Sequence, residues 1–251
     1  MAGPIEREAK GWQLNLPSCK KTSLKEFKIA IWSDDELAPV SQDISERCVE
    51  VGEKLASSGA TVSFSARPEH DFLKAEINYQ LLLQSVMQSG MSDEEFKHIE
   101  DIAANLEPGD DSVEAILAKG TVLSHRNWIR QNYAREQIKI SWSKFFEDWD
   151  LIICPQLATT AIEHNHKKIS ERTITVDNQE QRYFQQIFWP GLAVNAHLPS
   201  TVFPTGLSTN NMPIGLQAIG GLYEDKKTIK FTELFEDEFK SFVLPNLEET
   251  L

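Results

Sequence analysis

The sequence has only three cysteines, no cluster of basic residues and no long hydrophobic run, and each shortage excludes a class of protein. Cys19, Cys48 and Cys154 lie far apart, so they provide neither a disulfide framework nor a zinc site. Cysteine usage of this kind is typical of a reducing compartment, and we expect a cytoplasmic protein. Residues 1–16 are charged and lack an apolar core, so we expect no signal peptide there.

The charge balance is strongly acidic. The chain has 25 Lys and Arg against 38 Asp and Glu, which gives a net charge of -13, and adjacent basic residues occur at most in pairs. Nucleic acids bind clustered basic charge and anionic lipids repel an acidic surface, so we expect neither a nucleic-acid nor a membrane partner. No apolar stretch approaches the length that crosses a bilayer. With 251 residues, 41% of them hydrophobic, the chain is long enough to bury a core.

The first part of the chain predicts a strand, a helix and a second strand. Phe27–Trp32 (FKIAIW) is a short apolar run of the kind that forms a buried strand. Apolar residues then recur at helical spacing over 40–55, with Ser41 as the expected N-cap and Gly59 as the left-handed residue that ends the helix. Thr61–Phe64 (TVSF) is the second strand. A strand–helix–strand unit favours a parallel pair of strands.

The middle of the chain predicts helices. One is expected at 72–87, and Ser92 with Glu95 forms the capping box of another. A long helical pattern over 112–149 is expected to break near Gly120.

The last part of the chain differs in composition from the rest. Leu151–Cys154 (LIIC) predicts a buried strand, and the polar residues 156–182 predict a long loop. Residues 188–221 are rich in Pro and Gly with short apolar runs, which favours short strands joined by tight turns. A final amphipathic helix is expected at about 226–242. Because strands alternate with helices at both ends of the chain, we predict an α/β fold with helices on the faces of a sheet.

Several segments resemble amidase-signature enzymes. LPSTVFPTG (Leu198–Gly206) and MPIGLQAIGG (Met212–Gly221) are similar to the turn and strand near the C-terminal end of that family. Three further segments match as well: DLIICP (Asp150–Pro155), FKIAIWSDDELAPVSQDI (Phe27–Ile44) and YEDKKTIKFTELFE (Tyr223–Glu236). The five segments stand in the family's order and together span about residues 11–242.

The resemblance implies a mixed sheet with helices on both faces, incomplete in this chain. It implies that residues 1–251 are the C-terminal portion of an amidase-signature domain, with 1–26 as an extended lead-in and 27–251 as the α/β body. Family members cleave carboxamides with a serine nucleophile, a relay serine and a lysine base, inside a Gly/Ser-rich signature. That signature is absent, and the only adjacent serines, Ser57 and Ser58, belong to the expected end of a helix. We therefore predict no catalytic residue, metal or cofactor in this chain.

The resemblance also implies candidate substrate-binding residues. FWPGLA (Phe188–Ala193) fits the helix before the family's C-terminal turn, beside its acyl pocket. We interpret Phe188 and Trp189 as lining that pocket, with plain core packing as the alternative. The aromatic residues of the long helical segment are better explained as core. They are Trp128, Trp142, Phe145, Phe146 and Trp149.

Three other features carry side chains with reactive chemistry. His164 and His166 could share a metal, but they stand in a polar loop without a third ligand close in sequence, which favours a solvated loop. His197 has the intrinsic pKa for acid–base work. The family uses no histidine, so a structural role is favoured. Cys154 lies in an apolar run, where a buried, unreactive thiol is expected.

Three hypotheses for the whole chain remain open. In the first, it is the C-terminal half of an amidase and is inactive alone. In the second, it is a non-catalytic interaction subunit that pairs with a separate N-terminal half, or with itself, through an exposed sheet edge. In the third, it is a gene fragment without function.

Overall fold

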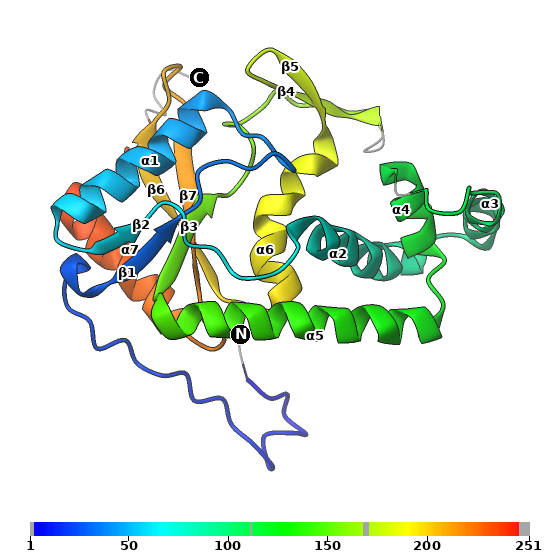
Figure 1. The fold of residues 1–251 in the computed structure, drawn as a ribbon, viewed down its shortest axis with the longest axis horizontal. Coiled ribbons are helices and arrows are strands. Elements are labelled where there is room, and N and C mark those ends of the chain that lie inside the picture. Colours follow the sequence, from blue (N-terminus) through cyan, green and yellow to red (C-terminus); the bar gives the residue numbers. More distant parts are fainter. Residues whose placement is uncertain (1–2, 111, 168–170, 246–251) are drawn as a thin grey trace. The chain divides into compact units, whose positions relative to one another are not determined.

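The computed structural model describes residues 3–110, 112–167 and 171–245, and the chain divides into two compact units (Figure 1). Unit 1 comprises Met1–Ala66, Phe146–Gln186 and Leu198–Leu251, and unit 2 comprises Arg67–Phe145 and Ile187–His197. Residues 1–2 and 246–251 of the expected domain lie outside the described residues. Within the described ranges, no helix is both long enough and apolar enough to cross a membrane.

Unit 1 is built on a five-stranded mixed sheet with the strand order β2-β1-β3-β7-β6. Its strands are β1 (Lys28–Ile31), β2 (Thr61–Ser63), β3 (Leu151–Pro155), β6 (Ser200–Leu207) and β7 (Pro213–Gly220). β1 pairs in parallel with β2 and β3, whereas β7 runs antiparallel to β3 and β6. The predicted α/β class and parallel pair are confirmed, and the strands from both ends of the chain join one sheet.

Two helices pack against this sheet, α1 (Gln42–Ser57) and α7 (Asp225–Phe239). A Cβ at Gly52 of α1 would lie 2.9 Å from Ile31 Cγ1, so glycine lets this helix approach β1 closely. From α7, the Phe231 ring meets Phe27 at 5.5 Å and Phe203 at 5.6 Å between ring centroids, both edge-on. These aromatic contacts tie the last helix to the residue that precedes β1 and to β6.

The ends of α1 follow the sequence in part. Ser41 occupies the N-cap position, which confirms the prediction, although its side chain makes no capping hydrogen bond. Gly59 follows the helix with a φ of +91°, which confirms the predicted left-handed residue.

The predicted loop over 156–182 is wrong in its second half. β4 (Thr173–Val176) and β5 (Gln179–Arg182) form a separate two-stranded antiparallel sheet. Asp177 and Asn178 join them with φ values of 46° and 65°, the conformation of a two-residue hairpin turn, which Asp and Asn tolerate well. The alternation of buried Ile174 and Val176 with exposed neighbours was the sequence signal for a strand.

The expectation of strands throughout 188–221, drawn from composition, is also wrong in part, whereas the helix that the resemblance implied at Phe188–Ala193 is confirmed. The first portion of this range is the helix α6 (Phe188–Ala196) of unit 2, and strands begin only at Ser200. Pro190 is compatible with a helix there because it lies in the first turn, where the backbone N–H has no partner within the helix. His197 ends the helix in the left-handed conformation with a φ of 56°.

The rest of unit 2 is helical. It contains α2 (Phe72–Met87), η2 (Gln88–Gly90), α3 (Asp93–Ala104), α4 (Val113–Thr121) and α5 (His125–Asp148), and the last residues of α5 belong to unit 1. Of two further short 3-10 helices, η4 (Tyr183–Ile187) precedes α6, and η1 (Leu24–Glu26) precedes β1 in unit 1. The capping box of Ser92 and Glu95 is confirmed. The predicted break near Gly120 is confirmed between α4 and α5. A Cβ at Gly120 would lie 2.8 Å from Gln84 Cβ, so this glycine lets α4 approach α2.

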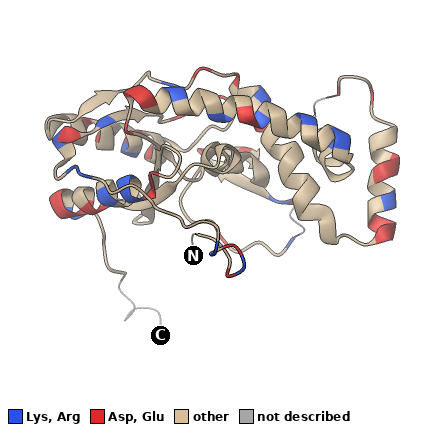
Figure 2. Cartoon of the chain, turned by 90° about the horizontal axis from the view of Figure 1, so that it is seen from below, with Lys and Arg blue, Asp and Glu red and all other residues tan. Residues whose placement is uncertain are grey.

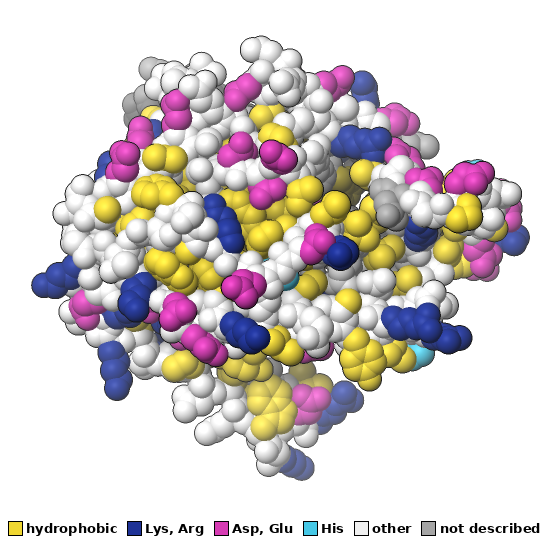
Figure 3. All heavy atoms as spheres, in the orientation of Figure 1, with side chains coloured by type: hydrophobic (Ala, Val, Ile, Leu, Met, Phe, Trp, Pro, Cys, Tyr) yellow, Lys and Arg dark blue, Asp and Glu magenta, His cyan; other side chains and the backbone are white. Residues whose placement is uncertain are grey.

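Charged residues of both signs are interspersed along the helices (Figure 2) and over the face drawn in Figure 3. Many ion pairs join two residues that lie three or four positions apart along the same helix, at the surface of α2, α3 or α7. Such pairs contribute little to stability. Asp150 is more enclosed, with 16% of its side chain exposed. Its carboxylate lies 2.7 Å from Lys21 Nζ and 3.6 Å from Lys227 Nζ, and it accepts the Lys28 N–H at 2.8 Å. Asp150 therefore links the lead-in, β1 and α7 at the start of β3.

Candidate functional site

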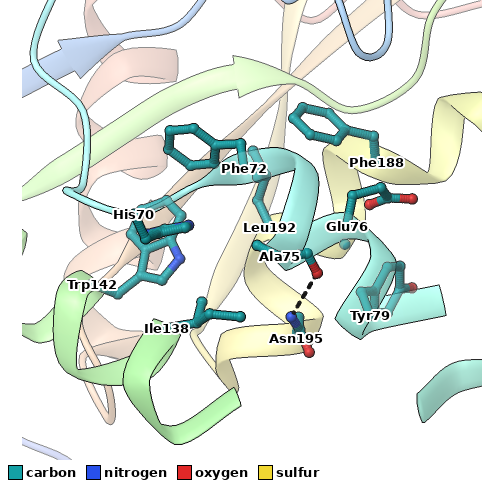
Figure 4. Close-up of a pocket in the computed structure, with 11 residues that line it drawn as sticks. His70, Phe72, Ala75, Glu76, Tyr79, Ile138, Trp142, Phe188, Leu192 and Asn195 are labelled. Carbon is teal, nitrogen blue, oxygen red and sulfur yellow. Dashed lines mark hydrogen bonds between the residues drawn. The ribbon is translucent and has the colours of Figure 1, made fainter. Parts of the chain in front are cut away.

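A small cavity lies inside unit 2, between α2, α5 and α6 (Figure 4). The residues that line it are His70, Phe72, Ala75, Glu76, Tyr79, Ile138, Trp142, Phe188, Gly191, Leu192 and Asn195. The free volume inside it is about 20 Å³, which is room for about one water molecule. In this conformation, the cavity is too small for the acyl group of an organic substrate.

The two residues that the resemblance proposed for substrate binding lie differently toward this cavity. Phe188 lines it and is 3% exposed, on the same side as Phe72 in Figure 4. Trp189 is fully buried and meets the Phe188 ring edge-on, with 5.3 Å between centroids, so it supports the wall from behind. A Cβ at Gly191 would lie 2.7 Å from the Tyr79 ring, so this glycine lets α6 approach α2 and narrows the cavity.

Glu76 of α2 brings a carboxyl group to the cavity. It accepts a hydrogen bond from Gln80 Nε2 at 2.7 Å. Burial raises the pKa of Glu76, and the hydrogen bond from Gln80 opposes this effect. Burial also raises the pKa of Tyr79, as does the negative charge of Glu76. A carboxyl group with a raised pKa holds its proton to higher pH than an exposed glutamate does, which makes Glu76 a candidate functional group.

A chain of amide groups connects the three helices around the cavity. Asn195 Nδ2 donates to Ala75 O, as Figure 4 shows, and to Asn78 Oδ1, both at 3.3 Å. Asn78 Nδ2 in turn donates to the backbone oxygen of Gln131 at 2.8 Å. Asn195 Oδ1 is buried and has no hydrogen-bond partner in the described chain. Buried acceptors nearly always have a hydrogen-bond partner, so this unpaired oxygen is a group that a donor inside the cavity can satisfy.

His70 completes the polar lining. Its Nδ1 lies 3.1 Å from Ser141 Oγ, and its ring centroid lies 6.1 Å from that of Trp142. Burial lowers the pKa of His70 to about 4, although the negative charge of Asp71 acts in the opposite direction. His70 is therefore a neutral imidazole near pH 7 and does not supply a positive charge to the cavity.

The shifted pKa of His70 makes unit 2 sensitive to acid. Below pH 6.5 the unfolded chain binds a proton at this residue while the folded chain does not, so stability falls as the pH drops from 6.5 toward 4. We expect the free energy of unfolding of His70→Asn, which can keep a hydrogen bond to Ser141, to fall by about 2 kcal/mol less between pH 7 and pH 4 than that of the unmodified chain. This figure allows for the partial exposure of the ring. Urea unfolding of both proteins at pH 7 and pH 4 measures it. His98→Asn, on exposed α3, is the control, and an equal effect of both variants contradicts the prediction.

A cationic group forms a second feature of unit 2. Arg135 and Lys139 of α5 lie near His197, whose pKa is lowered by burial and then by these two charges, while Glu136 opposes the shift. Lys139 pairs with Glu136 at 2.9 Å, and one Arg135 Nη donates to Asn132 Oδ1 at 2.5 Å. Arg135 Nε is buried without a partner in the described chain. With two cations, one carboxylate and an unused guanidinium donor, the group can hold an anion such as a carboxylate.

The other sequence candidates lie apart from these features. His164 and His166 are exposed, with 6.5 Å between ring centroids, and no three His, Cys, Asp or Glu side chains of the described residues are placed to hold a metal ion. Cys154 is fully buried in β3, as expected for a structural thiol. Ser58 follows the end of α1, as predicted, and its hydroxyl donates to Glu238. Trp142 is 1% exposed, in the core as expected, and it also lines the cavity.

Sequence reasoning missed Glu76, Asn195 and Arg135. The available signal was a polar residue inside an otherwise apolar segment, such as Asn195 in FWPGLAVNA. That signal is weak, because a polar residue on the solvent side of a helix gives the same pattern. Only the packing of α2, α5 and α6 shows which of these side chains is enclosed.

Comparisons with known proteins agree with this fold. The family model described as Amidase matches residues 8–229. The A subunit of glutamyl-tRNA(Gln) amidotransferase from Halothermothrix orenii is 22% identical over 242 residues, which cover 90% of this chain and 48% of that protein. The corresponding protein of Sulfurimonas denitrificans is 32% identical over 123 residues, which cover 47% of this chain and 25% of that protein.

Solved structures give the same result for the fold. The A subunit of glutamyl-tRNA(Gln) amidotransferase from Thermotoga maritima has a TM-score of 0.68 at 19% identity, over 98% of this chain and 51% of that chain. A fatty acid amide hydrolase has a TM-score of 0.61 at 17% identity, over 92% of this chain and 43% of that chain. The chain therefore spans about half the length of the relatives that it matches over most of its own length.

Proposed function

The chain belongs to the amidase family, and we propose that it supplies the C-terminal half of a carboxamide hydrolase whose nucleophile, relay serine and lysine base come from another segment. The observation that carries this proposal is the family match over residues 8–229 in a sequence without a Gly/Ser-rich signature. A serine hydroxyl is a weak nucleophile until a neighbouring base takes its proton, so we propose that this chain alone is inactive. Its span of about half of its relatives supports this division of labour.

Within such an enzyme, the cavity of unit 2 is the proposed substrate-binding wall. Phe188 would contact the acyl group, and Trp189 would hold the Phe188 ring in place. The cavity must widen first, because its present volume fits about one water molecule. Arg135 and Lys139 are proposed to bind an anionic end of the substrate, since the buried Arg135 Nε has no partner in the described chain.

A second candidate function is that of a non-catalytic interaction subunit. The observation that favours it is the position of β6 at one end of the strand order, with Val202 53% exposed. A strand with free backbone groups can pair with a strand of a separate N-terminal half. The relatives are named as subunits of an amidotransferase, and we propose that this chain likewise works beside another polypeptide. Its three free thiols support a reducing cytoplasm as the site of action.

A panel of amides and esters, together with a serine-directed covalent probe, tests the proposal. We expect the chain alone to give no turnover above buffer and no stoichiometric labelling, because it lacks the activated nucleophile. The matched control is the double variant Ser57→Ala, Ser58→Ala, which removes the only adjacent serines. Turnover by the unmodified chain, or labelling of one serine, would refute the inactive-half proposal, and loss of that signal in the control would locate the nucleophile.

A further inference from the structure

A polar cleft of about 450 Å³ opens in unit 1 at the start of α1. Its walls come from the first turn of α1, the segment after β3, the β4–β5 turn and the loop between β6 and β7, and every lining side chain is polar. The volume lies within the range of small-ligand sites. The cleft shares no residue with the proposed substrate-binding wall, so the inference that follows stands apart from the proposed function.

Three carboxylates line this cleft. Asp43 accepts hydrogen bonds from the Thr209 hydroxyl at 2.9 Å and from its N–H at 3.3 Å, and Asp177 accepts the Gln42 N–H at 2.7 Å. Glu46 accepts only the side-chain amide of Gln42 at 2.6 Å among the described residues. No Lys or Arg lines the cleft, and none of the three is in an ion pair within the described chain. The partial positive charge of about +0.5 at the start of α1 is smaller than their combined charge.

The second observation is Ser41, a largely buried residue whose hydroxyl makes no hydrogen bond among the described residues. It lines the cleft and is 8% exposed. An N-cap serine normally accepts a backbone N–H of the first turn through its hydroxyl. Here the Ile44 N–H bonds to the Ser41 backbone oxygen at 3.0 Å instead. The hydroxyl is thus left with both its donor and its acceptor capacity toward the cleft.

We propose that this cleft binds a primary ammonium group, carried either by a free polyamine or by a lysine side chain of a partner protein. An ammonium group offers three donors and a positive charge, which suit the Ser41 hydroxyl and the carboxylates of Asp43 and Asp177. A metal ion fits less well, because no three His, Cys, Asp or Glu side chains in the described ranges are placed to hold one.

Calorimetric titration of the full chain at low salt tests this proposal. The two probes are spermidine, for a free polyamine, and Nα-acetyl-lysine N-methylamide, whose side-chain ammonium group is free, for a lysine side chain. We expect saturable binding of at least one probe, weakened about tenfold by Asp43→Asn or Asp177→Asn and several-fold by Ser41→Ala. If spermidine binds much more tightly than the lysine probe, beyond what its larger number of ammonium groups explains, the site is a polyamine site. If the two probes have equal affinity per ammonium group, the site is a lysine site.

Glu53→Gln is the matched control, because Glu53 is an exposed carboxylate of the same helix that does not line the cleft. It should leave the affinity unchanged, and a thermal melt of each variant checks that it folds. Two variants at separate wall segments, Asp43→Asn and Asp177→Asn, keep the test valid if one of them unfolds. The proposal is overturned if neither probe binds saturably, if Glu53→Gln weakens binding as much as Asp43→Asn, or if Mg²⁺ displaces both probes at equal concentration.

Discussion

Replacing Phe231 with alanine is expected to remove about 4 kcal/mol from the free energy of unfolding of unit 1. The Phe231 side chain is fully buried, and its ring touches Phe27, Phe203 and Phe235 with centroid distances of 5.5, 5.6 and 6.1 Å. Alanine would leave a cavity between Phe27, β6 and α7, which the surrounding rings cannot fill without losing their edge-on contacts. Since domains are stable by about 5–15 kcal/mol, this is a large part of the total.

Urea unfolding followed by tryptophan fluorescence measures the loss. Ile229→Ala is the matched control, because Ile229 lies on the same helix, is 57% exposed and should change stability by less than about 0.5 kcal/mol. Phe and Ile have similar helix propensities and both are replaced with alanine, so the change in helix propensity is similar in the two variants. A loss below about 1.5 kcal/mol for Phe231→Ala would mean that α7 is not held by this aromatic cluster.

The isolated chain is expected to self-associate through β6, and Val202→Pro is expected to suppress that association. The Gly220 N–H donates to Pro199 O at 3.0 Å, which sets the phase of the β6–β7 ladder. Counting by twos from this bond, Thr201 and Phe203 bond toward β7, whereas the backbone groups of Val202 and Pro204 point away from it. Pro204 already lacks an N–H, so proline at Val202 removes a further edge donor without breaking a bond to β7.

Light scattering and sedimentation over a salt series measure this effect. The net charge of -13 keeps molecules apart at low salt, and this repulsion is screened over about 8 Å at physiological ionic strength, so association should increase with salt. Val202→Thr is the control, because it removes an exposed apolar group but keeps the N–H and a β-branched side chain. If the wild-type chain is a monomer at every salt concentration, or if both variants associate equally, β6 is not the interface.

Local patterns were sufficient for much of the fold. The apolar runs at 27–32 and 151–154 became β1 and β3, since a short buried strand needs little beyond an uninterrupted apolar segment between turn residues. The capping box at Ser92 and the break near Gly120 set helix boundaries by hydrogen bonds and glycine propensity within a few residues. The order of five short segments then indicated the family.

Local patterns failed where two structures suited the same residues. FWPGLAVNA is apolar throughout and contains Pro and Gly, so its composition fits short strands as well as the buried helix α6. Gly191 lets this helix approach Tyr79 of α2, a contact between residues far apart in the sequence that no local pattern shows. The hairpin of β4 and β5 was missed because only two of its residues, Ile174 and Val176, carry the alternating apolar signal.

The sequence by itself determined the family, the α/β class and the absence of the Gly/Ser-rich signature, because these depend on residue order and spacing alone. Only the tertiary structure decided which polar groups are enclosed. His70, Glu76 and Asn195 come together around one cavity because α2 and α6 pack closely, and burial then shifts the pKa values of His70 and Glu76. Desolvation depends on every atom that surrounds a group, so no pattern along the chain could have specified it.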